Sequence, residues 1–155
     1  MKRIFVIVAG LAMVTFLSCS KKPDTGGTAT QSVANEWWVT LSDGTNTTGH
    51  APIATYNTAA NTNEMWIDDE GNLWEFKVKA SVDLSALTFK ATNAQNEYYN
   101  ITATITDGKI IRDAGRSKTG NVTDSIYMKV EFSDDPGTIY TIAGHARTRF
   151  AEDDY

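Results

Sequence analysis

The segment IYMKVEF, residues 126–132, decides the class of fold, because inward-type side chains (Ile, Met, Val, Phe) alternate in it with Tyr, Lys and Glu. A β-strand that is buried on one face has this period of two. The segment WEFKVK, residues 74–79, repeats the pattern with Trp, Phe and Val. Both segments are predicted to be strands.

Weaker forms of the same alternation recur along the chain and bring the predicted total to about eight strands, the others being 37–41, 53–56, 65–68, 87–91, 101–105 and 139–150. Turn-forming residues separate them, including residues 69–72 and 106–108, and Gly71 or Gly108 could adopt positive φ in a hairpin turn. No segment has a convincing helical pattern. Asp83 is expected to cap a single turn over residues 83–87.

About eight short antiparallel strands either stack as two sheets or close into a barrel. Closure removes the exposed edges of the sheet, so we predict an all-β, up-and-down barrel over residues 35–155. An eight-stranded barrel has room for packed side chains or for one small ligand.

The chain begins with a short cationic stretch, an apolar run that ends at Leu17, and a single cysteine, Cys19. The apolar run is shorter than the about 20 residues of a membrane-spanning helix. Residues 1–18 therefore resemble a bacterial lipoprotein signal peptide, which implies that Cys19 carries fatty acyl chains such as palmitate. The alternative is an ordinary secretory peptide, cleaved or uncleaved, with an incidental cysteine.

Residues 19–34 are then the lipidated cysteine and a flexible tether rich in Gly, Ser and Thr. Ser20 is not the Asp that retains such lipoproteins at the inner membrane, so the expected location is the outer membrane, facing the periplasm or the surface. The net charge of −5 argues against nucleic acid as a partner. One cysteine also excludes an internal disulfide and a cysteine-based metal cluster.

Several motifs in order resemble a family of bacterial lipoproteins, the lipid-binding putative hydrolases, which are described as lipocalin-like. They are EWWVT (36–40), TYNTAAN (55–61), EMWIDD (64–69), VDLSALTF (82–89), GTIY (137–140) and the pair Gly144-His145. The resemblance implies a lipocalin-like barrel and a lipid or other apolar small molecule as ligand. It supplies no catalytic residues.

The inward-facing set of the predicted barrel is apolar and aromatic. We expect it to line a ligand cavity or to fill a solid core, and the sequence leaves both open; its members are Trp37, Met65, Trp74, Phe76, Val78, Met128 and Phe132.

Lipocalins pack a tryptophan of the first strand under an arginine near the end of the last strand. Here Trp37 or Trp38 could form such a cation–π contact with Arg147 or Arg149 and close the barrel floor. The alternative is that both arginines pair at the surface with the acidic residues 152–154.

Few residues offer catalytic chemistry. His50 and His145 are the only bases that titrate near neutral pH, and they could meet at the barrel rim. The acidic turn 68–72 carries oxygen ligands that suit Ca²⁺ but lacks the EF-hand register. We predict no metal and no cofactor.

The sequence therefore favours a membrane-anchored, lipocalin-like protein that binds a lipid or other apolar molecule. A second interpretation is a surface module that binds a glycan or a protein of an outer-membrane assembly through Trp38, Trp66 and Tyr98. A third is a hydrolase, as the family label suggests.

Overall fold

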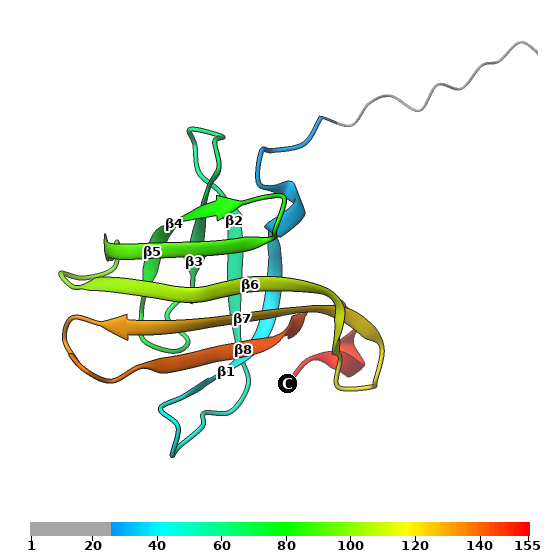
Figure 1. Cartoon of the computed structure of the whole chain (residues 1–155). Coiled ribbons are helices and arrows are strands. Elements are labelled where there is room, and N and C mark those ends of the chain that lie inside the picture. The colour runs from blue at the N-terminus through cyan, green and yellow to red at the C-terminus, as the bar shows by residue number, and fades with distance from the viewer. Residues whose placement is uncertain (1–25) are drawn as a thin grey trace, which may run out of the picture.

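A computed structural model describes residues 26–155, and the predicted signal peptide and Cys19 lie outside these residues. Eight antiparallel strands form a closed barrel in which each strand pairs with the next and β8 pairs with β1. Figure 1 shows β5 to β8 running across the view and β1 to β3 running steeply past them. The strands are β1 (Asn35–Ser42), β2 (Ala51–Asn57), β3 (Glu64–Asp68), β4 (Lys77–Asp83), β5 (Thr88–Gln95), β6 (Thr102–Arg116), β7 (Val122–Phe132) and β8 (Tyr140–Ala146). This confirms the predicted all-β barrel of eight strands.

Two short 3₁₀ turns flank the barrel, η1 (Gln31–Val33) and η2 (Ala151–Asp153). No helix in residues 26–155 has the length and apolar character needed to cross a membrane.

The barrel closes where the first strand meets the last. Six residue pairs join β1 to β8, from Trp37 opposite Ala146 to Ser42 opposite Thr141. Gly144 lies so close to β1 that a Cβ atom there would be 1.9 Å from the carbonyl oxygen of Trp38. The seam therefore requires a residue without a side chain at this position.

Alternation along the strands builds the core, as the pattern predicts. In β7 the side chains of Ile126, Met128, Val130 and Phe132 are buried, while their neighbours are half-buried on the other face. The inward side chains of all eight strands meet in one apolar cluster.

The predicted strand 74–79 is wrong in its first half, because β4 begins only at Lys77. The preceding loop is organised by the buried carboxylate of Asp69. Its two oxygens accept hydrogen bonds from the backbone N–H groups of four loop residues, at 2.7 to 3.2 Å; these are Gly71, Leu73, Trp74 and Phe76. The Asp69 side chain thus supplies the hydrogen-bond acceptors that a neighbouring strand would supply if residues 74–76 were part of a strand.

The predicted hairpin turn at residues 106–108 is also wrong, because β6 runs straight through it. The register shifts against both β5 and β7 at this point, so the segment is a β-bulge. Asp107, with φ 55°, has the left-handed conformation that we expected at Gly108. Gly71 does have the predicted positive φ, at 75°.

The real turn after β6 lies further along the chain, at residues 117–121, where Gly120 has φ 93°. The predicted turn over 83–87 is present between β4 and β5. The Asp83 carboxylate accepts hydrogen bonds there from the N–H groups of Ser85 and Ala86.

Gly108 has no room for a side chain. A Cβ atom there would lie 2.4 Å from both the ring and the carbonyl oxygen of Phe89, the residue opposite on β5. Gly108→Ala should therefore lower the free energy of unfolding by about 3 kcal/mol, as overpacking a fixed backbone does. Urea denaturation measures the change. Gly49→Ala is the control, because no atom lies within 4 Å of its added Cβ; equal stability of the two variants would contradict the steric argument.

Candidate functional site

The residues proposed from the sequence as a ligand lining come together inside the barrel. Six of them are at most 1% exposed, namely Trp37, Met65, Phe76, Val78, Met128 and Phe132. The indole N–H of Trp37 donates a hydrogen bond to the hydroxyl of Thr55 at 2.9 Å. These side chains are packed against one another in the core cluster.

The seventh residue, Trp74, is half-buried and covers one end of this core. Its indole stacks on the ring of Phe132, with centroids 4.8 Å apart and planes 1° from parallel. The Tyr140 ring lies beside it at 4.9 Å. The Tyr140 hydroxyl donates a hydrogen bond to Asp135 at 2.6 Å, which raises the pKa of this tyrosine to about 12.

A cleft with a volume of about 720 Å³ spans strands β4 to β7. This volume lies within the range of small-molecule sites, about 300 to 1,000 Å³. Six of its lining residues are exposed and polar or charged, while the apolar residues Val82 and Phe89 are buried. The full lining is Ser81, Val82, Asp83, Thr88, Phe89, Lys90, Asp107, Gly108, Lys109 and Tyr127.

The charged residues of the cleft differ in how far they are already paired. Asp107 forms an ion pair with Lys129 at 2.8 Å, and this hydrogen bond lowers the pKa of the Asp107 carboxyl. Asp83 is engaged by the turn that follows it. Within the part of the chain that the structure describes, Lys90 and Lys109 form no ion pair. The ammonium group of Lys109 lies over the ring of Tyr127, 5.0 Å from its centroid.

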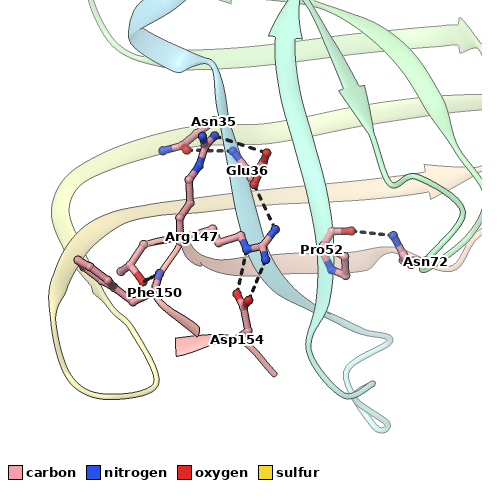
Figure 2. Close-up of polar contacts among 9 residues, drawn as sticks. Asn35, Glu36, Pro52, Asn72, Arg147, Phe150 and Asp154 are labelled. Carbon is pink, nitrogen blue, oxygen red and sulfur yellow. Dashed lines mark hydrogen bonds and ion pairs between the residues drawn. The ribbon is translucent and has the colours of Figure 1, made fainter. Parts of the chain in front are cut away.

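The arginine contact lies on the outer face of the barrel. The guanidinium of Arg147 is 5.4 Å from the ring centroid of Trp38, whereas Trp37 faces the core. The same guanidinium binds both carboxylate oxygens of Asp154, at 2.8 and 2.9 Å, and reaches Glu36 at 3.3 Å (Figure 2). Arg149 is exposed and contacts Glu36 at 3.4 Å.

Residues 147–155 form what we call the C-terminal strap. The predicted last strand is wrong beyond Ala146, because the chain leaves β8 there and lies beside the β6–β7 hairpin (Figure 1). The buried carboxylate of Asp153 fixes the strap by accepting hydrogen bonds from the backbone and hydroxyl of Thr119, the hydroxyl of Thr148 and the amide of Asn121. The Tyr155 ring then covers Trp38 edge-on at 5.5 Å.

The two histidines lie beside Tyr155 of the strap, outside the barrel, where His50 is exposed. Their ring centroids are 6.4 Å apart, and His50 stacks on Tyr155 at 3.7 Å. Partial desolvation lowers the pKa of His50, and the neighbouring His145 lowers it further. His145 is buried, with Nδ1 3.1 Å from the carbonyl oxygen of Ala146 and Nε2 3.4 Å from the Tyr155 hydroxyl. Among the hydrogen bonds of residues 26–155, none joins either imidazole to a carboxylate.

In the acidic turn 68–72, the carboxylates of Asp68 and Asp69 already form hydrogen bonds within the protein. Asp68 accepts hydrogen bonds from the hydroxyls of Tyr56 and Tyr98 and lies 3.4 Å from the ammonium of Lys77. Asp69 holds the loop described above. Residues 26–155 contain no group of three or more His, Cys, Asp or Glu side chains able to hold a metal ion.

The three aromatic residues of the predicted interaction surface, Trp38, Trp66 and Tyr98, differ in how far they are exposed. Trp38 lies under the strap. Trp66 is half-buried, with the ammonium groups of Lys77 and Lys79 over its ring at 5.2 and 5.0 Å. Tyr98 is exposed, and its hydroxyl donates a hydrogen bond to Asp68. Three features were missed from the sequence: the Asp69 loop, the strap and the cleft. An Asp beside a Gly turn and a short acidic tail were visible signals for the first two.

The Asp69 carboxylate determines where Trp74 and Phe76 lie. Asp69→Ala leaves four backbone donors without their acceptor, so it should lower the free energy of unfolding by about 3 kcal/mol. Thermal unfolding followed by near-ultraviolet circular dichroism measures this change together with the order of the aromatic end. Glu97→Ala, at an exposed residue, should change neither; an Asp69→Ala protein as stable as this control would contradict the role of Asp69.

The strap should respond to acid. Hydrogen bonds, chiefly from Thr119, lower the pKa of the Asp153 carboxyl. This group therefore contributes stability above its unfolded pKa of about 4, and the contribution is lost as the pH falls through the lower folded value. Asp153→Asn should unfold at a lower temperature than the native chain at pH 7, and the difference should shrink below about pH 4. Glu152→Gln is the control at an exposed neighbour, and a difference independent of pH would contradict this role.

The fold and the site place the chain in a class of small β-barrel proteins with an apolar interior and an outer cleft. A family model described as lipid-binding putative hydrolase matches residues 22–151. The chain therefore belongs to the family of lipid-binding putative hydrolases. No curated protein sequence matches it.

Proposed function

We propose that this protein binds a single lipid or other apolar small molecule and carries or senses it at the cell envelope, without chemistry of its own. The observation that carries the proposal is the family match, which covers the whole barrel up to η2. A closed barrel with one apolar core and a cleft of about 720 Å³ supports it, because both features suit a small amphipathic ligand.

We further propose that the protein is tethered to the outer membrane. In this proposal residues 1–18 are a signal peptide that is removed, Cys19 is lipidated, and residues up to 34 separate the barrel from the bilayer. Each buried methylene of an acyl chain contributes about 0.8 kcal/mol, so two or more chains hold such a protein stably on a membrane. The barrel would then sample lipids close to the surface that holds them.

Two locations for the ligand follow from the residues. One is the barrel interior around Trp74, Phe76 and Met128, where an entering molecule must displace side chains that now fill the space. The other is the outer cleft, which is already open to solvent. The first location requires a rearrangement of the core and the second does not.

The test is mass spectrometry of an organic extract from the chain that starts at Ser20, which keeps the entire closed barrel. The expected result is a fatty acid or similar lipid in about stoichiometric amount, either as purified or after incubation with mixed membrane lipids. An extract that stays empty in both cases would overturn lipid binding. The same extraction from a β-barrel protein of another family controls for lipid carried over in purification.

A further inference from the structure

We infer that the outer cleft of β4 to β7 binds the anionic head of a lipid, a carboxylate or a phosphate, between Lys90 and Lys109. The inference rests on the proposed lipid binding and adds the place and the chemical class of the head group. It is carried by the arrangement of the strands, the pairing of charges and the shape of the bulge in β6.

The strand register gathers the cleft residues on one outer face. Asp83 lies opposite Thr88, Thr88 opposite Lys109 and Lys109 opposite Tyr127, so a continuous row crosses four strands. Lys90 is two residues along β5 from Thr88 and therefore projects from the same face. The register against β6 shifts between Phe89 and Ala91, so Lys90 lies at the bulge, and both lysines line the same cleft.

The bulge at Asp107 and Gly108 shapes this face. One extra residue in β6 against both neighbouring strands bends the sheet locally and turns Asp107 outward, where Lys129 pairs with it. Gly108 brings the backbone of β6 against Phe89. The cleft thus lies at the place where the ladder is irregular.

Charge pairing identifies the sign of the ligand. The chain as a whole is acidic, with a net charge of −5, yet both lysines that line the cleft are outside the ion pairs of residues 26–155. The two carboxylates of the cleft are already engaged, Asp107 by Lys129 and Asp83 by backbone N–H groups. An entering anion would therefore meet two ammonium groups, with the hydroxyl of Thr88 nearby, while the Ser81 hydroxyl donates to the carbonyl oxygen of Lys90 at 3.2 Å.

The remainder of the cleft suits the part of a lipid next to its head. The ring of Tyr127 forms one wall of the cleft, whereas Val82 and Phe89 are buried and alternate with its exposed residues, so their side chains face the core. An aromatic ring contacts methylene groups without leaving polar atoms unpaired. A purely inorganic anion would make no use of this wall.

Binding of laurate and of dihexanoyl phosphatidic acid to the chain from Ser20 onward, measured by titration calorimetry, tests the inference. The native protein should bind at least one of them, and Lys90→Gln with Lys109→Gln should weaken that binding at least tenfold. Thr88→Trp keeps both charges but fills the cleft, and it should weaken binding to a similar extent. Lys79→Gln is the matched control, because this lysine also lies 5.0 Å from an aromatic ring, that of Trp66, but outside the cleft; its affinity should stay within twofold of native.

The ligands themselves supply further controls. Dodecanol, which has the chain of laurate without its charge, should bind at least tenfold more weakly than laurate. Inorganic phosphate that binds as tightly as the lipids would overturn the lipid assignment of the cleft. Circular dichroism of each variant confirms that a lost affinity does not reflect unfolding.

Failure of this inference differs from failure of lipid binding. A protein that yields lipid on extraction, but binds neither probe or binds them equally in the cleft variants, would overturn the cleft as the site. Loss of binding in Met128→Ala with no loss in the cleft variants would move the ligand to the interior. A native protein that yields no lipid and binds neither probe would overturn the proposed function itself.

Discussion

The pairing of β1 with β8 is the constraint on which the rest of the structure depends. It gives every strand two neighbours, so no edge is left with unpaired backbone groups that another chain could join. Two adjacent tryptophans of β1 lie on opposite faces of the barrel at this seam, since Trp37 faces the core and Trp38 faces outward. The strap covers the outward one, and Gly144 allows the two strands to approach.

Much of this fold could be predicted from the alternation of side chains. A period of two in segments such as 126–132 identifies strands buried on one face, and the need to remove edges from a set of eight favours closure. The pattern misplaced the start of β4, because Trp74 and Phe76 are both inward but belong to a loop. The Asp69 carboxylate accepts hydrogen bonds from four backbone N–H groups in this loop, and such an arrangement produces no periodic pattern in the sequence.

The bulge in β6 shows a second limit. Asp-Gly is typical of a hairpin turn, and the same two residues also suit an extra residue inserted into a continuous strand. Which of the two forms depends on whether the chain beyond finds a partner, and here residues 109–116 continue to pair with β7. The cleft was missed for a related reason, since Lys90 and Lys109 look like ordinary solvent-facing residues until four strands are placed side by side.

Closure by the first and last strands also governs how the chain reaches its native state. Trp37 on β1 pairs with Ala146 on β8, so the barrel cannot close until the chain has been made as far as β8, and Tyr155 of the strap cannot cover Trp38 before that. Contacts between such distant residues slow folding, because a long loop must close before any contact compensates for it. A chain that has been made only as far as β7 therefore leaves β1 and β7 as open edges of the sheet, with backbone groups that another chain could pair with.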